Sequence, residues 1–266
     1  MSVVRLRIDV GYDGTDFAGW ARQPGQRTVE DTLAAAITTV LRLAEPAALT
    51  VAGRTDAGVH AVGQVVHDDL PAGTEPDVLA RRLGGVLPPD VVVRSVAVAP
   101  DGFDARFGAV GRRYRYRVSD GPLDPLRRRD TLTWSRPLDP DAMTAAGAAL
   151  VGEHDFAAYC RPREGATTIR TLRRLGATRE PDGVIAIAAE ADAFCHNQVR
   201  AMVGALLMVG DGRRPIEWPA EVLAARVRDS AVTVAPAHGL TLIGVDYPPD
   251  NELAARAVTA RARRRP

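Results

Sequence analysis

The chain has 266 residues, 46% of them hydrophobic, and a formal net charge of +1. This length and apolar content are enough for one large or two smaller domains with their own cores, so no disulfide or metal is needed to hold the fold. The chain has two cysteines, no charged-then-apolar leader and no apolar run of membrane-spanning length. These features argue against a disulfide scaffold and a transmembrane protein, and predict a reduced, soluble, cytoplasmic protein.

Strand and helix patterns alternate along the whole chain. In the first half, hydrophobic periodicity predicts strand 3–10, loop 11–27, helix 29–41, strand 49–52, strand 64–68, helix 77–87 and strand 91–98. In the second half it predicts strand 112–118, helix 139–150, strands 170–179 and 184–191, a long helix 197–209, helix 219–226 and strand 241–246. Single helices between strands, twice over, indicate an α+β fold whose two halves share a mixed, mainly antiparallel sheet flanked by helices, with a central cleft.

The predicted organisation is an N-terminal half over residues 1–105, a C-terminal half over 106–250 and a basic tail over 251–266. The loop 100–111 is the expected boundary between the halves. The tail carries Arg261 and three further arginines near its end. It is expected to be amphipathic or disordered, either solvated or in contact with RNA.

The loop at residues 53–60, GRTDAGVH, is the strongest local signal for chemistry. It connects two strand patterns, where functional residues are often found. Its glycines permit backbone conformations closed to other residues, and Arg54 favours the charged form of Asp56. Asp56 is therefore a candidate nucleophile or general base. The alternative is a glycine-rich turn with a local ion pair. The loop at residues 11–20 mixes glycine, polar and aromatic residues, and is either a loop that closes over a ligand or a plain turn.

Arginine is concentrated between residues 105 and 136. This segment contains nine arginines and three aspartates, a local excess of six positive charges. Such a surface suits a polyanion, since guanidinium groups bind phosphate and stack on bases. Period-two alternation on strand 112–118 separates two faces, with Arg113, Arg115 and Arg117 on one and Arg112, Tyr114 and Tyr116 on the other. We expect Tyr114 and Arg112 to bind substrate, with the tyrosine stacked on a nucleobase. Core packing is the alternative, and it suits Tyr116 better than Tyr114.

Arg200 lies within the apolar helix 197–209, and an arginine in such a place needs a carboxylate partner. Asp56 is the expected partner, and the alternatives are Glu190 and Asp192. Two metal sites are also conceivable. One would use Cys195, His196, Cys160 and His154, and the other Asp13, Asp16, Asp56 and His60. The cysteine and histidine set does not have the usual spacing of paired ligands, and no phosphate-binding glycine loop is present, so neither a metal nor a cofactor is expected.

The sequence resembles the tRNA pseudouridine synthases that act on the anticodon stem-loop, collinearly over most of its length. The motifs that carry the resemblance are 12–20 (YDGTDFAGW), 53–60 (GRTDAGVH), 103–107 (FDARF), 113–116 (RYRY), 152–156 (GEHDF), 199–200 (VR) and 236–240 (PAHGL). Cys195 and Ala201 depart from the pattern, where leucine and asparagine are expected. The resemblance implies the pseudouridine synthase fold.

The resemblance also implies roles for individual residues. Asp56 matches the catalytic aspartate, Arg200 the partner that holds it, and Arg54 the residue that displaces the target nucleotide. Tyr114 matches the tyrosine that stacks on the uracil, and Leu240 an apolar contact to the flipped base.

The implied reaction is the conversion of uridine to pseudouridine at positions 38, 39 and 40 of tRNA. The implied enzyme is a cytoplasmic homodimer that uses an aspartate nucleophile and no cofactor. The carboxylate either adds to C6 of the base or acts at the ribose. Two other functions remain, an RNA-binding module without activity and a metal-dependent phosphoesterase.

Overall fold

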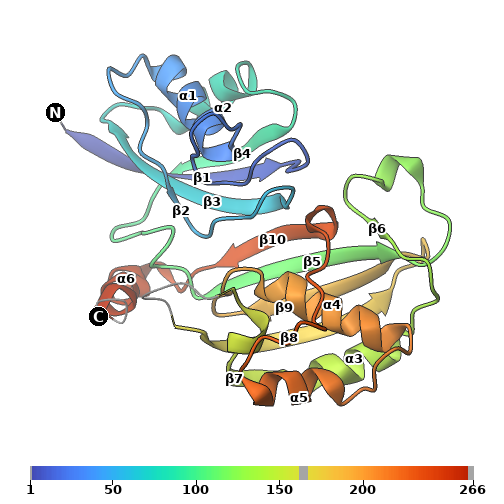
Figure 1. The fold of residues 1–266 in the computed structure, drawn as a ribbon. Helices are drawn as coiled ribbons and strands as arrows, with labels where there is room; N and C mark the ends of the chain where they lie inside the picture. The colour runs from blue at the N-terminus through green and yellow to red at the C-terminus, as the bar shows by residue number, and fades with distance from the viewer. Residues whose placement is uncertain (1, 162–166, 263–266) are drawn as a thin grey trace. The chain divides into compact units, whose positions relative to one another are not determined.

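The computed structural model describes residues 2–161 and 167–262, which form two compact units (Figure 1). The first unit takes in the chain up to residue 110 together with the part from residue 242 onward. The second unit is the stretch between them, residues 111–241.

The first unit is built on antiparallel strands. β1 (Val3–Tyr12) lies between β4 (Val91–Val98) and β3 (His60–Pro71), and the short β2 (Thr50–Val51) also pairs with β3. The next neighbour of β3 is β10 (Leu240–Asp246), whose residues from Leu242 belong to this unit. The long β3 leads directly out of the 53–60 loop, so the loop is anchored to the middle of a sheet.

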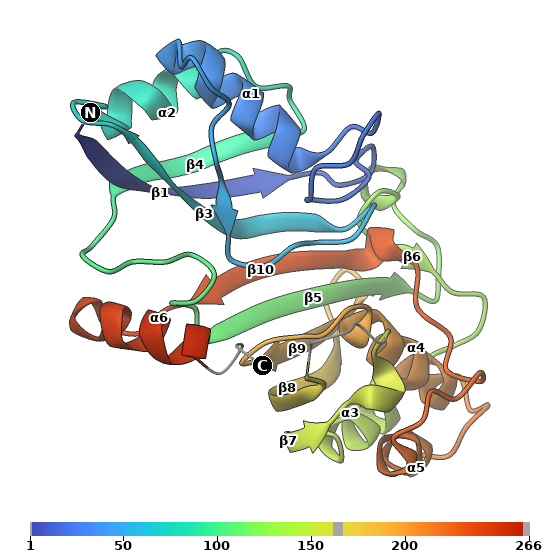
Figure 2. The same cartoon turned by 60° about the vertical axis from the view of Figure 1, so that its left-hand side comes forward.

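Two helices cover one face of this sheet, α1 (Val29–Leu41) and α2 (Pro76–Gly84) (Figures 1 and 2). Thr28 caps α1 by accepting a hydrogen bond from the Asp31 backbone N–H, and its hydroxyl donates to the Asp31 carboxylate at 2.8 Å. Fully buried side chains of β1, α1 and α2 form the core between the helices and the sheet, among them Leu6, Ile8, Leu33, Ile37, Leu79 and Leu83.

The expected tail forms a helix in the first unit, α6 (Leu253–Ala262), preceded by the short 3-10 turn η4 (Asp250–Glu252). Leu253 is buried in a cluster with Phe103 and Ala105, so the segment is amphipathic, one of the two expected forms. Arg261 forms an ion pair with the Asp104 carboxylate at 2.6 Å. The arginines at 263, 264 and 265 lie outside the described residues.

The second unit contains the antiparallel strands β5 (Gly111–Ser119), β9 (Ile185–Ala191), β8 (Ile169–Arg179) and β7 (Gly152–Asp155), in that order. The two-residue β6 (Leu132–Thr133) adds a parallel pairing with β5. The helices α3 (Pro140–Ala148), α4 (Gln198–Gly210) and α5 (Trp218–Ala225) lie on one side of these strands (Figure 2). The remaining 3-10 turns are η1 (Pro125–Arg127), η2 (Ala157–Tyr159) and η3 (Ala237–Gly239).

The predicted α+β class, with mainly antiparallel strands flanked by helices, is confirmed. Each of the predicted strands and helices is present within a few residues, whereas β6 and β7 were not predicted and the segment of α6 was expected only as an amphipathic or disordered tail. Among residues 2–161 and 167–262, no helix has both the length and the apolar character needed to cross a bilayer.

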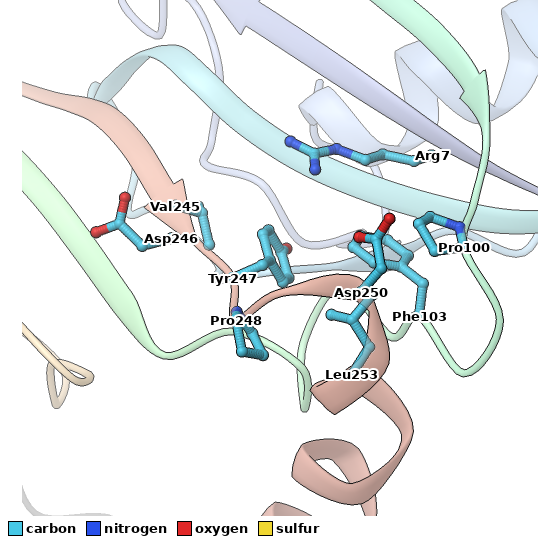
Figure 3. Close-up of a pocket in the computed structure, with 9 residues that line it drawn as sticks. All are labelled: Arg7, Pro100, Phe103, Val245, Asp246, Tyr247, Pro248, Asp250 and Leu253. Carbon is cyan, nitrogen blue, oxygen red and sulfur yellow. The ribbon is translucent and has the colours of Figure 1, made fainter.

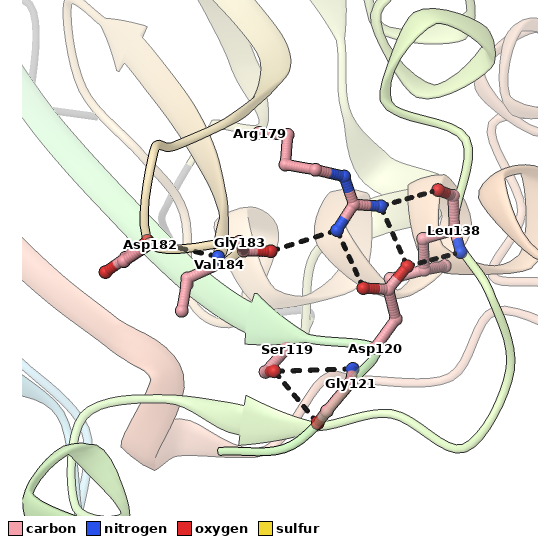
Figure 4. Close-up of polar contacts among 8 residues, drawn as sticks. All are labelled: Ser119, Asp120, Gly121, Leu138, Arg179, Asp182, Gly183 and Val184. Atoms are coloured by element: carbon pink, nitrogen blue, oxygen red, sulfur yellow. Dashed lines mark hydrogen bonds and ion pairs between the residues drawn. The ribbon is translucent and has the colours of Figure 1, made fainter. Parts of the chain in front are cut away.

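A charged cluster in the second unit stabilises the turn after β5 (Figure 4). The Asp120 carboxylate accepts two hydrogen bonds from Arg179, each 2.8 Å, and a third of 2.8 Å from the Leu138 backbone N–H. The Asp120 side chain is 11% exposed. The hydrogen bonds from Arg179 lower the pKa of Asp120 to about 2.

Because the folded-state pKa of Asp120 is depressed, its contribution to stability is present above pH 4 and is lost as the pH falls toward 2. Asp120→Asn is expected to lower the free energy of unfolding at pH 7 by about 1–2 kcal/mol. Urea unfolding from pH 7 to pH 3 measures this, with the exposed Asp77→Asn as the control. The difference in free energy of unfolding between wild type and Asp120→Asn should become smaller below about pH 4. A difference that does not change with pH would contradict a depressed pKa of Asp120.

Candidate active site

The Asp56 loop of the first unit is held by the loop at residues 11–20. The Trp20 N–H donates to Thr55 O at 3.0 Å, and the Gly58 N–H donates to Phe17 O at 3.3 Å. The Val59 N–H closes the turn by donating to Asp56 O at 3.2 Å. Backbone hydrogen bonds on both sides of Asp56 therefore fix the course of the chain at this residue.

The side chains around the loop form a buried polar network. The hydroxyls of Tyr12 and Thr55 are 2.8 Å apart, and Gln64 donates to Tyr12 at 3.2 Å and to Gly53 O at 2.8 Å. Burial raises the pKa of Tyr12 to about 12, so this phenol stays neutral. The Gly14 N–H donates to Nδ1 of buried His60 at 2.9 Å. The first loop is thus a structural support for the aspartate loop.

Asp56 is half-buried, whereas Arg54, two residues earlier, is exposed. In the described part of the chain Arg54 has no hydrogen bond or ion pair. The local Arg54–Asp56 ion pair, the structural alternative for this loop, is therefore not formed.

Gly19 is where the two loops come closest. Its φ is +101°, and a Cβ at this position would lie 2.9 Å from Thr55 O and 3.2 Å from the Asp56 carbonyl carbon. Backbone atoms cannot move aside as a flexible side chain can, so the side chain of any other residue would displace the Asp56 loop.

Gly19→Ala is expected to lower the free energy of unfolding by about 2 kcal/mol and turnover by about tenfold or more, because the aspartate moves. Gly25→Ala is the matched control, since Gly25 has a φ of +70° but open space around its Cβ position. The control should lose about 1 kcal/mol through backbone strain and keep its turnover. Urea unfolding and turnover assays measure both variants. Equal turnover losses in the two would show that contact with the Asp56 loop is unimportant.

In the second unit, β5 has the two faces that alternation predicts. Arg112, Tyr114 and Tyr116 lie opposite Ala191, Ala189 and Ile187 of β9. Tyr116 is fully buried, and its hydroxyl donates to Pro236 O at 2.9 Å, so its predicted core role is confirmed. Tyr114 is half-buried, with its ring edge-on to Phe194 at a centroid distance of 5.4 Å.

Arg112 is buried, and its Nη1 donates to Asp192 O at 2.8 Å. It therefore braces the connection between β9 and α4, which carries Phe194. On the opposite face, Arg117 forms ion pairs with Glu180 and Asp182. Exposed arginines of this unit include Arg113, Arg128, Arg129 and Arg136.

Arg200 and Leu240 are connected through one segment, residues 233–240. Arg200 Nε donates to Ala235 O at 2.7 Å, and the Ala235 N–H donates back to Arg200 O at 3.0 Å. The same segment reaches Tyr116, where a Cβ on Gly239 would meet the ring at 2.6 Å. Leu240 follows this turn and is buried.

The acids considered as alternative partners of Arg200 have other contacts. Glu190 pairs with Arg174 at 3.5 Å, and the Asp192 carboxylate accepts the Thr171 and Ala193 N–H groups. Phe194 was not among the predicted site residues, although its position between a strand and the helix that carries Arg200 was a usable signal.

Residues 2–161 and 167–262 contain no group of three or more histidine, cysteine or acidic side chains that could hold a metal ion. A cavity of about 330 Å³ in the first unit is lined by Arg7, Phe103, Tyr247 and Asp250, among others (Figure 3). Arg7 lies over the Tyr247 ring, 5.3 Å from its centroid. The cavity includes none of the candidate site residues.

The two cysteines, expected as reduced thiols, are joined as a disulfide, so that expectation is wrong for this structure. Cys160 follows η2 and Cys195 lies in the β9–α4 connection, with a Cα–Cα distance of 5.8 Å. The connection that carries Phe194 is therefore covalently linked to the second unit's core.

Comparison with known proteins gives consistent results. The family model described as tRNA pseudouridine synthase matches residues 10–108 and 146–248. The chain is 64% identical to tRNA pseudouridine synthase A of Frankia casuarinae, over 99% of this chain and 97% of the relative. It is 58% identical to that of Streptomyces griseus, over 97% and 93%, and 53% identical to that of Mycobacterium leprae, over 97% and 94%.

Proposed function

The chain belongs to the tRNA pseudouridine synthase family, and on that premise we propose that Asp56 is its nucleophile and the tRNA anticodon stem-loop its target. The proposed reaction converts uridine to pseudouridine at positions 38, 39 and 40. The enzyme is an isomerase, because the product has the same atoms as the substrate. The N1–C1′ bond breaks, a C5–C1′ bond forms, C5 loses a proton and N1 gains one.

The observation that carries this proposal is the way Asp56 is presented. Its loop is fixed by backbone hydrogen bonds from Trp20 and Gly58, and its carboxylate is half-buried on a strand connection. A nucleophile fixed in this way needs no rearrangement to meet a bound substrate. The same carboxylate serves either route, addition to C6 of the base or action at the ribose.

Other residues supply binding and orientation in this proposal. Tyr114 stacks on the target uracil, Leu240 adds an apolar contact, and Arg200 holds the Asp56 carboxylate. Arg54, which is exposed two residues before the aspartate, takes part in displacing the target nucleotide. Arg112 was expected to bind substrate, but it is buried and donates to Asp192 O, so in this proposal it supports the site by bracing the connection that carries Phe194.

The target nucleotide has to leave the base stack before it can react, at a cost of a few kcal/mol. Stacking on an aromatic side chain returns about 1–3 kcal/mol. Phosphate contacts can offset the rest of the free energy of unstacking. The second unit has exposed arginines suited to such contacts, Arg113, Arg128, Arg129 and Arg136.

The proposal includes a cytoplasmic homodimer that works without a cofactor or metal. Pseudouridine formation should be indifferent to EDTA, since a carboxylate nucleophile supplies the chemistry. A strong loss of activity with chelator would favour a metal-dependent enzyme instead. Sedimentation of the purified protein, alone and with tRNA, determines its oligomeric state.

The decisive experiment maps pseudouridine by carbodiimide labelling and primer extension on an unmodified tRNA transcript. Stops are expected at uridines 38, 39 and 40 and should disappear singly when each uridine is replaced by cytidine. Stops elsewhere would retain the family reaction and overturn the proposed target. Binding of the transcript without any stop would favour an RNA-binding module.

A further inference from the structure

The connection between β9 and α4, residues 192–197, joins two parts of the proposed site. Phe194 contacts the Tyr114 ring edge-on, with an interplanar angle of 81°. Arg200 follows in the first turn of α4. A shift of this connection would therefore alter the support of the tyrosine and the start of the helix that carries the arginine.

The connection is held by local hydrogen bonds and by contacts with the rest of the second unit. Asn197, which precedes α4, has a φ of +66°, in the left-handed region that asparagine adopts more readily than most non-glycine residues. Its side chain makes no capping hydrogen bond to α4. The Cys195 N–H donates to Gln198 Oε1 at 3.0 Å, and the His196 carbonyl accepts the Arg161 N–H at 3.0 Å. Contacts with the rest of the second unit add to these local hydrogen bonds in holding the conformation.

The strongest of these contacts is the link from Cys195 to Cys160. The two residues are 35 positions apart, yet their Cα atoms are 5.8 Å apart, within the range of disulfide bonds. Cys160 is 1% exposed, whereas Cys195 is half-buried and accessible from solvent. They are the only cysteines in the sequence, so no other intramolecular pairing competes.

We infer that Cys160 and Cys195 form a reversible redox clasp that sets the position of Phe194 against Tyr114, and so controls turnover. Phe194 is the positioning residue through which the clasp acts. This inference rests on the proposed role of Tyr114. A disulfide in a protein that works on intracellular tRNA is more often a redox sensor than a permanent staple.

Closure of the clasp, that is, formation of the Cys160–Cys195 disulfide, needs an oxidant. A low-molecular-weight disulfide can supply the oxidation. The Cys195 thiolate attacks that disulfide and releases one thiol, which leaves a mixed disulfide on Cys195. The Cys160 thiolate then attacks the Cys195 sulfur and releases the second thiol. Two protons leave the cysteines, and the oxidant is reduced to two thiols. The exposure of the two side chains suits this order, since only Cys195 is accessible.

The test compares the full-length protein in dithiothreitol and in oxidised glutathione, with thiols counted by alkylation and mass spectrometry. The closed clasp is expected to raise kcat by about threefold or more, with KM for tRNA nearly unchanged, because the site is pre-ordered rather than enlarged. Amide exchange at residues 193–200 should slow by roughly tenfold. A protein that keeps both thiols in oxidised glutathione, or shows the same kcat and exchange in both states, overturns the inference.

Two variants separate positioning from general stability. Cys160→Ser/Cys195→Ser should match the reduced wild type in both buffers. Phe194→Leu should still close the disulfide and slow its amide exchange, yet lose the redox dependence of kcat. If kcat still depended on the redox state in Phe194→Leu, the disulfide would not act through Phe194. If neither redox form makes pseudouridine, the proposed function fails, and amide exchange alone decides whether the clasp exists.

Discussion

Replacement of Asp56 by asparagine should lower pseudouridine formation by about 10³-fold or more, while tRNA binding changes by less than about threefold. The amide has nearly the same shape as the carboxylate but is a very poor nucleophile. The fold should survive, because backbone hydrogen bonds such as that from Trp20 to Thr55 O hold the loop. Single-turnover assays and filter binding measure the two effects separately.

Asp16→Asn is the matched control for this prediction. Asp16 is an exposed acid on the neighbouring loop, and it belongs to the alternative metal-binding set of Asp13, Asp16, Asp56 and His60. If Asp56 acts as a nucleophile, the control keeps its turnover, and EDTA has no effect on the wild type. Turnover that survives in Asp56→Asn would remove the carboxylate from the chemical step.

Tyr114→Ala should abolish turnover and leave tRNA binding within about tenfold of the wild type. The ring is expected to hold the flipped uracil, whereas most of the affinity for tRNA comes from phosphate contacts elsewhere. Tyr114→Phe keeps the stacking surface and loses only the hydroxyl. It therefore tests whether the phenol also takes part in removing the C5 proton.

Tyr116→Phe is the control for the neighbouring aromatic position on the same face of β5. Loss of the hydrogen bond from its hydroxyl to Pro236 O should cost about 1 kcal/mol of stability, with little effect on kcat. Turnover and urea unfolding are measured on all three variants. Near-normal turnover in Tyr114→Ala would refute the stacking role, and a large kcat loss in Tyr116→Phe would show that the two tyrosines are not distinct.

The sequence alone determined the features that depend on local pattern. The capping residue Thr28 and apolar residues at helical spacing were enough to place α1, whose observed bounds match the prediction. Period-two alternation placed Tyr114 and Tyr116 on the same face of β5, as the pairing with β9 confirms. The octet around Asp56 marked this aspartate as a candidate nucleophile or general base from its local chemistry, and the reaction class came from the resemblance that this and the other motifs carry.

Contacts between distant segments were decided only by the tertiary structure. The packing of Gly19 against Thr55, the contact of Phe194 with Tyr114, and the link from Cys160 to Cys195 each join residues more than 30 positions apart. Nothing local marks such pairs, because they depend on sheet register and on which helix covers which face. The polar strand β7 and the two-residue β6 escaped prediction for the same reason. Their strand conformation comes from pairing with β8 and β5, not from their own residues.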